Sequence, residues 1–319
     1  GADSVKILQP EKLARRLEAL APHPRVVASG NFATPRTLLN LFDANVATYT
    51  LHMLNAQGEL PTRPGVTHET TFVGPAMRKS PTLMYYPCRL SLTPKILRNQ
   101  LLVDVLVLHT SLPRDGVVSM GLEVNILPAV LEAVRDRGGL ILAQVNPRMP
   151  FTYGDAVVAV EDIDYAIEVD EPLMTHEPGE PDQVAKAIAD HILYKIPDGA
   201  TLQLGIGAVP DAVLGALTSR RGLRIWSEMF SDGVLALHRL GCFDSDVPLT
   251  ASFAFGSRQL YEWLDGNRRV RMRRTETTND PGRISRTPSM ISVNGALQVD
   301  LYGQANASRI KGRIYSGFG

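Results

Sequence analysis

The stretch LRIWSEMFSDG (223–233) sets one carboxylate, that of Glu228, among apolar residues. An apolar, strand-like run ends at Trp226, and Met229 and Phe230 follow the glutamate directly. A glutamate with an ordinary pKa of about 4.3 is ionised but well solvated, so it is a poor nucleophile until water is partly excluded. On spacing alone, the stretch favours an ordinary first-turn helix glutamate, stabilised by the helix dipole, over a carboxylate that is held in an apolar setting for a functional reason.

A glycine turn precedes this stretch in LQLGIGAVPDAVL (202–214), which is typical of a strand, a turn and a helix entered through Pro210. Glycines at such a turn, here Gly205 and Gly207, let backbone N–H groups approach an anion or a carbonyl closely. The third glycine of a dinucleotide fingerprint is absent, and no GxxxxGK[ST] phosphate loop occurs. The pattern alone leaves a plain tight turn and a ligand-binding loop equally open.

The composition favours a globular protein that acts on small molecules. The 319 residues carry no formal net charge, and 44% of them are hydrophobic. A chain without net charge has no overall electrostatic field that would attract nucleic acid. No apolar run approaches the roughly 20 residues of a membrane helix. Since the first residues do not resemble a secretory signal, we expect a cytoplasmic protein without nucleic-acid or membrane partners. The lone cysteines Cys88 and Cys242 form no CxxC pair, so neither a zinc site nor a disulfide framework is suggested, and both are expected to be buried apolar residues rather than catalytic thiols.

Apolar strand-like runs alternate with helical patterns along the whole chain, which predicts an α/β fold with largely parallel, helix-covered sheets. Strands are expected at 25–29, 101–109 and 140–145, and Thr34 and Pro35 are expected to begin a helix as its cap and first-turn proline. The polar, proline-rich stretch at 170–183 suggests a domain boundary. We therefore expect two consecutive α/β domains, residues 1–178 and 179–319.

Several motifs together resemble the acetyl-CoA hydrolase/transferase family, which includes acetate, 4-hydroxybutyrate and itaconate CoA-transferases. The second half contributes LGIGAVPDAVL, SEMFSDGV, SVNGALQVDLYGQANA and YSGFG, in that order. The first half contributes HETTFVGPAMRKS, GVVSMG, AQVNPRMPFTYGD and IDYAIEVDEPL. The resemblance thus extends over nearly the whole chain.

The resemblance implies roles for particular residues. Glu228 matches the family's covalent nucleophile, and the segment that lies against CoA matches Gly205, Ile206, Gly207, Ala208 and Val209. The terminal YSGFG matches a further glycine loop against the thioester, which assigns Ser316, Gly317 and Gly319 to CoA binding. Where the family usually continues into more α/β structure this sequence stops, and Asn306 to Arg309 replaces its usual NAES. We therefore expect the second domain to be incomplete at its C-terminal end.

The implied activity is the transfer of CoA from an acyl-CoA to a small carboxylic acid by ping-pong kinetics. Glu228 would attack the acyl-CoA to form a mixed anhydride, and the CoA thiolate would return to form a glutamyl-CoA thioester. CoA is then a co-substrate, no metal is needed, and a homo-oligomer, a dimer, is expected. An acyl-CoA hydrolase that uses the same glutamate and a non-catalytic ligand-binding module are the alternatives.

Other polar residues have weaker patterns. His68 is expected to be structural or to orient substrate, with a general base as the alternative. The basic stretch at 267–276 is expected to be a solvated face paired with acids, although it is also suited to the phosphates of CoA. A second carboxylate or a hydroxyl of the acid substrate could be bound by Arg78, Asn146 and Arg148.

Overall fold

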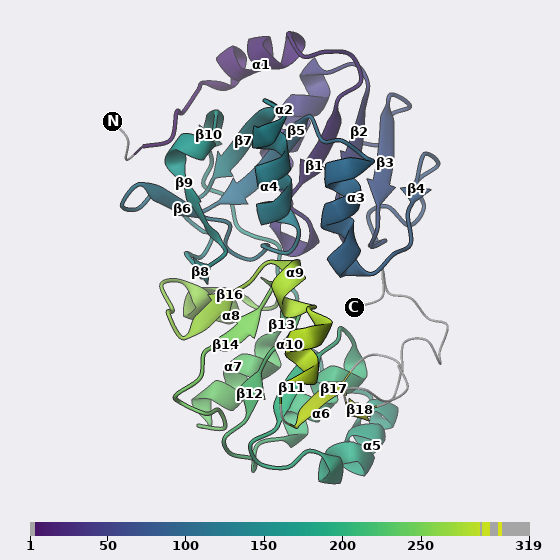
Figure 1. Cartoon of the computed structure of the whole chain (residues 1–319), viewed down its shortest axis with the longest axis vertical. Helices are drawn as coiled ribbons and strands as arrows, with labels where there is room; N and C mark the ends of the chain where they lie inside the picture. Colours follow the sequence, from purple (N-terminus) through teal and green to yellow (C-terminus); the bar gives the residue numbers. More distant parts are fainter. Residues whose placement is uncertain (1–3, 288, 294–298, 302–319) are drawn as a thin grey trace.

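The computed structural model describes residues 4–287, 289–293 and 299–301. Helices and strands alternate around two main parallel sheets, one built from each half of the chain (Figure 1). The predicted α/β fold class is therefore confirmed. The boundary near residue 178 stays a prediction, although residues 169–182 contain neither helix nor strand.

The first half forms a seven-stranded sheet in which each strand pairs in parallel with its neighbours. The strands alternate with helices because parallel neighbours require crossover connections. In spatial order they are β10 (Tyr165–Glu168), β7 (Leu140–Val145), β5 (Val105–Thr110), β1 (Arg25–Ala28), β2 (Tyr49–His52), β3 (Val66–Thr70) and β4 (Met84–Tyr85).

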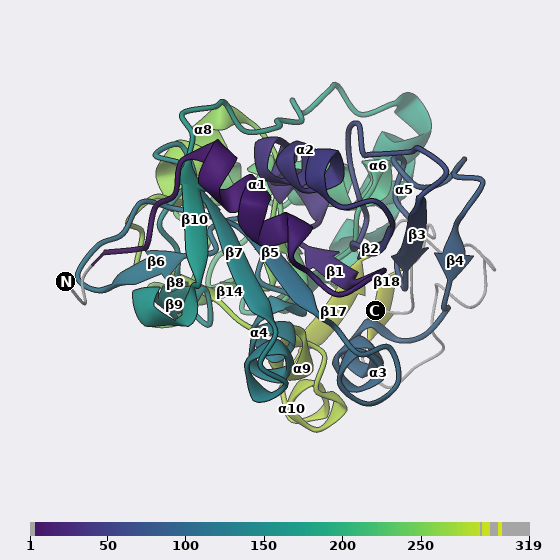
Figure 2. The same ribbon diagram turned by 90° about the horizontal axis from the view of Figure 1, so that it is seen from above.

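Helices cover both faces of this sheet (Figure 2). Helices α1 (Pro10–Glu18) and α2 (Arg36–Asn45) lie on one face, and α3 (Thr93–Asn99) and α4 (Leu127–Asp136) lie on the other. Successive side chains of a strand point to opposite faces of the sheet, so one strand contributes to the core on each face. Val105 and Val107 of β5 pack in the core beside α1 and α2, whereas Leu106 and Leu108 pack in the larger core that also includes the second half.

Two local predictions in this half were wrong. The strand expected from residue 101 begins at Val105, since Leu101 to Asp104 lie in the loop after α3. The capping residue of α2 is Pro35, and the buried hydroxyl of Thr34 has no hydrogen-bond partner in the part of the chain that the structure describes, so Thr34 is not a side-chain cap. The position of the helix was nonetheless correct.

The second half forms a four-stranded sheet in the order β12 (Arg224–Ile225), β11 (Thr201–Leu204), β17 (Met290–Val293) and β18 (Val299–Leu301). The first three strands are parallel, and β18 is antiparallel to β17. Its helices are α5 (Gln183–Ile192), α6 (Ala208–Ala216), α7 (Asp232–Arg239), α8 (Arg258–Leu264), α9 (Thr275–Thr278) and α10 (Pro281–Ser285).

Several short strands form smaller sheets, and one of these joins the two halves. Strand β8 (Tyr153–Gly154) pairs with β16 (Val270–Met272), which pairs in turn with β14 (Leu249–Ala251). The other pairs are β6 (Val117–Ser119) with β9 (Val157–Ala159) and β13 (Met229–Phe230) with β15 (Phe253–Ala254). The remaining elements are the 3-10 turns η1 (Asn31–Ala33), η2 (Leu90–Leu92), η3 (Val160–Asp162) and η4 (Leu193–Lys195).

The cysteine prediction holds for one residue of the two. Cys242 is fully buried, whereas Cys88 is half-buried and its thiol lies beside the hydroxyl of Thr93. Among the helices that the structure describes, none has the length and apolar character that crossing a bilayer requires.

Candidate active site

Glu228 lies between two short strands, after β12 and directly before β13. Its backbone carbonyl accepts hydrogen bonds from the amides of Ser252, at 2.8 Å, and Phe253, at 3.0 Å. Helix α7 begins only at Asp232, so the alternative of a first-turn helix glutamate is wrong. The glutamate is held by strand pairing at the end of the sheet.

The glycine turn begins at the same edge of the sheet, because the carboxyl ends of the parallel strands β11 and β12 lie together. Ser227 connects the two strand ends: its Oγ accepts from the amide of Leu204 at 2.8 Å and donates to the Leu204 carbonyl at 3.2 Å. The next residue, Gly205, starts the loop, and Gly207 has a φ of 140° just before α6. The structure thus brings Glu228 and the Gly205 to Val209 loop to one edge.

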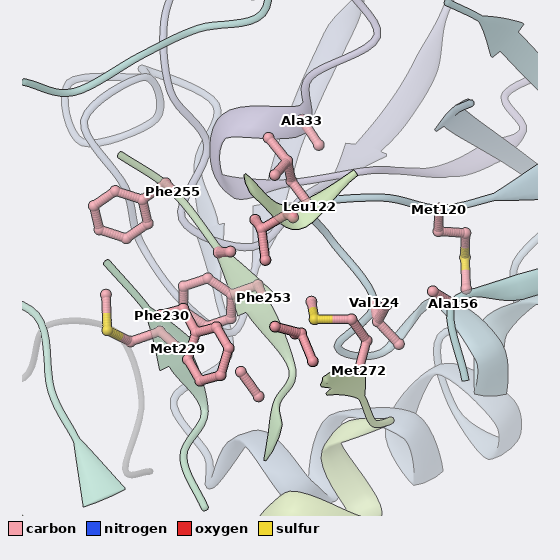
Figure 3. Packing of buried hydrophobic residues seen from close by; sticks show 14 of the residues in the cluster. Ala33, Met120, Leu122, Val124, Ala156, Met229, Phe230, Phe253, Phe255 and Met272 are labelled. Carbon is pink, nitrogen blue, oxygen red and sulfur yellow. The ribbon is translucent and has the colours of Figure 1, made fainter. Parts of the chain in front are cut away.

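Apolar residues flank the glutamate in the chain. Met229 and Phe230 are buried, and they pack with Phe253 and Phe255 of the neighbouring strand segment (Figure 3). Trp226 is half-buried and its indole N–H donates to a backbone carbonyl. Two of the three expected neighbours are thus buried in the core, whereas Glu228 itself is half-buried, and the shielding of its carboxyl by them stays a prediction.

This environment changes the acidity of Glu228. Its Oε1 is buried and has no hydrogen-bond partner within the described ranges. Burial raises the pKa of the Glu228 carboxyl to about 7, because desolvation disfavours the charged form. A buried polar atom without a partner is costly and is typical of a functional site.

A second glutamate from the first half reaches the same site, and the sequence prediction missed it. Glu123 is 1% exposed and forms a β-bridge with Phe253, the residue whose amide holds Glu228. Burial raises its pKa to about 8, and the charge of Glu228 contributes in the same direction, against the hydrogen bond from Asn31. The available signal was GLEVN, in which Glu123 stands between Leu122 and Val124 just as Glu228 stands among apolar residues.

Two asparagines extend from Glu123 into the first half. The amide of Asn31 donates to Glu123 Oε2, and Asn31 Oδ1 accepts from the amide of Asn55 at 2.8 Å. Asn31 and Asn55 both have a φ of 47°, and Asn125 has a φ of 45°. Non-glycine residues in this left-handed region store strain, which concentrates at functional sites. The cluster therefore marks the face of the first half that meets Glu228.

The other candidates do not join this site. Both ring nitrogens of the buried His68 are occupied, Nδ1 with Ser80 Oγ and Nε2 with the Pro61 carbonyl, each at 2.7 Å. Burial lowers the pKa of His68, which agrees with a neutral structural residue. Arg78 is exposed.

Two further candidates bind the segment that follows β10 (Tyr165–Glu168). Buried Asn146 donates to the Glu171 carbonyl at 2.9 Å, and Arg148 forms an exposed ion pair with Asp170. In the basic stretch Arg274 is paired with Glu132, at 2.7 Å, and with Glu276, at 2.8 Å. Ser316, Gly317 and Gly319 lie outside the described residues.

Metal ligands were not expected, and the described ranges contain no group of three or more His, Cys, Asp or Glu side chains suited to a metal ion. The chemistry available at this site is that of two buried carboxyls, a glycine turn at a helix start and an apolar wall.

Comparison with known proteins agrees with this architecture. The model of the acetyl-CoA hydrolase/transferase N-terminal domain matches residues 26–176, and that of the C-terminal domain matches residues 256–319. The 4-hydroxybutyrate coenzyme A transferase of Clostridium kluyveri is 34% identical, covering 98% of this chain and 76% of its own length. A succinyl-CoA:acetate/propanoyl-CoA:succinate CoA transferase of Fasciola hepatica is 30% identical over 92% of this chain and 65% of its own length.

Two other proteins extend the comparison. An acetyl-CoA hydrolase of Neurospora crassa is 26% identical, covering 71% of this chain and 44% of its own length. A crystal structure of the 4-hydroxybutyrate CoA-transferase of Porphyromonas gingivalis has a TM-score of 0.76 and 27% identity, and the match covers 91% of this chain and 72% of that one. This chain belongs to the acetyl-CoA hydrolase/transferase family and is homologous to acyl-CoA:carboxylate CoA-transferases.

Proposed function

We propose that this protein transfers CoA from an acyl-CoA to a small carboxylic acid, with Glu228 as the covalent nucleophile. The observation that carries the proposal is the position of Glu228: its Oε1 is buried without a hydrogen-bond partner among the described residues, and it lies at the sheet edge where the glycine turn begins.

The reaction balances without a metal or an external energy source, because one thioester is exchanged for another. A carboxylate oxygen of Glu228 attacks the acyl-CoA carbonyl, the carbon–sulfur bond breaks, and a mixed anhydride and CoA thiolate result. The thiolate attacks the glutamyl carbonyl, which releases the first acid and leaves a glutamyl-CoA thioester. A second acid reverses these two steps and leaves as the new acyl-CoA.

The raised pKa of Glu228 suits this role. With a pKa of about 7, Glu228 is substantially ionised near neutral pH and yet poorly solvated, which favours nucleophilic attack. The opposite case, a solvated glutamate on a surface helix, would have no such shift. The placement of Glu228 at a strand end therefore supports the nucleophile assignment.

Each tetrahedral intermediate develops an oxyanion, for which backbone N–H groups are suitable donors worth about 10²–10³-fold in rate. The Gly205 amide already donates to the carbonyl of Val293 at 2.6 Å, as part of the sheet. We therefore assign the oxyanion to Gly207 among the two glycines of this turn, and CoA to the surface of the Gly205 to Val209 loop. Ser316, Gly317 and Gly319 remain candidates for the other side of the thioester.

Mass spectrometry of the intact protein tests the nucleophile. After mixing with acetyl-CoA, the wild type should gain a CoA adduct that maps to the peptide containing Glu228, and Glu228→Gln should gain none. Glu262→Gln is the matched control, because Glu262 is exposed on α8 and, among the described residues, pairs only with Arg258. Absence of the adduct in folded wild type would leave a ligand-binding module as the better function.

The hydrolase is the second candidate, since the Neurospora crassa relative carries that activity in its name. A hydrolase uses the same glutamate but lets water intercept the glutamyl intermediate. Acetyl-CoA consumption with and without propionate separates the two. Formation of propionyl-CoA supports a transferase, whereas free CoA released at a rate independent of propionate supports a hydrolase.

A further inference from the structure

The first half of the chain holds a cavity whose described lining residues include neither Glu228 nor the glycine turn. Its volume is about 330 Å³, which is within the range of small-molecule sites. The residues around it follow β1, begin α2, end β5 and follow β10. Four segments that are distant in the sequence therefore form one cavity.

The topology of the seven-stranded sheet explains why a cavity forms here. Strand β1 lies between β2 and β5, so the chain builds the sheet outward on one side of β1 and then returns to build the other side. Open parallel sheets bind ligands in the crevice that such a reversal leaves outside the carboxyl ends of the strands. Phe32 and Thr34 follow β1, and His109 is near the carboxyl end of β5, so the cavity lies at this crevice.

Helix α2 contributes a polar side to the cavity. Its apolar residues are buried against the sheet, whereas Arg36, Thr37 and Asn40 are exposed and line the cavity (Figure 2). Arg36 and Asn40 are four residues apart and so lie on one face of the helix. The first turn of a helix also favours negative charge. This side of the cavity therefore suits a ligand carboxylate.

The hydroxyl of Thr34 is an unused hydrogen-bond donor in the same wall. Thr34 is 4% exposed, and its Oγ1 has no hydrogen-bond partner within the described ranges. Buried hydroxyls are normally hydrogen-bonded, so this one is available to a polar group that enters the cavity.

Two opposite charges line the cavity without pairing with one another. Arg36 is exposed and has no ion pair in the part of the chain that the structure describes. The Glu171 carboxylate accepts a hydrogen bond from the hydroxyl of Thr37 and likewise has no ion pair there. The cavity thus presents one free cation and one free anion to a ligand.

His109 adds no third charge. Its Nδ1 donates to the Ala33 carbonyl at 3.1 Å, and its Nε2 accepts from the amide of Asn146 at 3.1 Å. Burial lowers the pKa of His109 to about 4, which keeps the ring neutral near neutral pH.

The apolar part of the wall is held in place by the second half of the chain. The ring of Phe32 stacks on that of Phe255 with centroids 4.6 Å apart, and the Met174 carbonyl accepts from the hydroxyl of Tyr261 at 2.7 Å. This surface is therefore formed before a ligand binds, which lowers the cost of binding an apolar group.

We propose that this cavity binds a small zwitterion, an amino acid with an apolar side chain. Its carboxylate lies at Arg36 and the start of α2, its ammonium group at Glu171, and its side chain against Phe32 and Met174. A plain carboxylic acid leaves the charge of Glu171 uncompensated, and a plain amine leaves that of Arg36 uncompensated, so charge complementarity favours a molecule that carries both. The site is separate from Glu228 and does not depend on the proposed function.

Calorimetry with L-norvaline tests the site. The wild type should bind one molecule per chain. Arg36→Gln and Glu171→Gln should each weaken binding about tenfold, because each removes one charged contact with the ligand. Arg15→Gln and Glu18→Gln, at exposed positions of α1, are the matched controls and should bind as the wild type does. No binding by the folded wild type, or binding that neither cavity variant weakens, overturns the proposal.

Displacement experiments separate the zwitterion from its two halves. Pentanoate lacks the ammonium group of norvaline, and n-butylamine lacks its carboxylate. Each should displace isotope-labelled norvaline at least about tenfold less well than unlabelled norvaline does. Because only displacement is scored, pentanoate that binds as an acid substrate beside Glu228 does not count. Displacement by pentanoate at the same concentration as norvaline would show a plain carboxylate site and overturn the assignment.

Discussion

The hydroxyl of Ser227 satisfies both polar backbone groups of Leu204, with its amide at 2.8 Å and its carbonyl at 3.2 Å. Ser227 precedes the proposed nucleophile, and Leu204 precedes the glycine turn. One buried side chain thus sets the spacing between the two parts of the site.

Ser227→Ala should lower both stability and activity. The buried amide of Leu204 would lose its partner, which costs about 1–3 kcal/mol in the free energy of unfolding. Adduct formation with acetyl-CoA should slow because Glu228 and the glycine turn are no longer held in register. Chemical denaturation and the adduct rate measure these effects. Ser219→Ala, whose hydroxyl is exposed, should change stability by less than about 0.5 kcal/mol.

Glu228→Gln should stabilise the protein at high pH while it abolishes the adduct. The carboxyl has a folded pKa of about 7 against a reference of 4.5, so its contribution to stability is fully present below the lower value and is lost as pH rises through the higher one. The variant should equal the wild type near pH 4 and exceed it by about 3 kcal/mol at pH 8.

Urea titrations at the two pH values measure this difference. Glu262→Gln, on an exposed face, should match the wild type within about 0.5 kcal/mol at both. A Glu228→Gln variant that is less stable than wild type at pH 8 would contradict a buried, unpaired carboxylate.

Gly207→Ala should damage the loop that is proposed to bind CoA. Its φ of 140° lies in a region that residues with a side chain rarely adopt, so the substitution should cost about 1–3 kcal/mol or displace the loop. Weaker CoA binding by calorimetry is expected in either case. Gly215→Ala in the same helix is the control: its new Cβ meets nothing within 4 Å, and it should stabilise the protein by about 0.5–1 kcal/mol.

Phe32 and Phe255 should be energetically coupled across the two halves. Their rings are stacked with centroids 4.6 Å apart and planes at 11°. A double-mutant cycle with leucine at each position should give about 0.5–1.5 kcal/mol of coupling in the free energy of unfolding. The pair Phe32 and Phe42 should instead be additive, because Phe42 packs in the other core layer. Additive effects for the first pair would mean that the stack does not hold the halves together.

The sequence by itself determined the alternation of helices and strands, the glycine turn before α6 and the unusual setting of Glu228. These features depend on residues that are close together in the sequence: a period of two along a strand, turn residues at a strand end, and a carboxylate with apolar neighbours. The same local patterns were less reliable at the ends of elements, where Thr34 proved not to cap α2 and β5 began later than expected, because burial and tertiary hydrogen bonds decide such boundaries.

Only the tertiary structure brought a second buried glutamate, Glu123, to the segment that holds Glu228. Glu123 lies far away in the sequence and meets the site through its bridge to Phe253, and Asn31 and Asn55 orient it by side-chain hydrogen bonds between separate strand ends. The pKa of each carboxyl depends on the water excluded and the charges brought near when the two halves pack together. The water excluded from a carboxyl and the charges near it both depend on residues that are distant in the chain. A local sequence pattern therefore cannot predict the pKa.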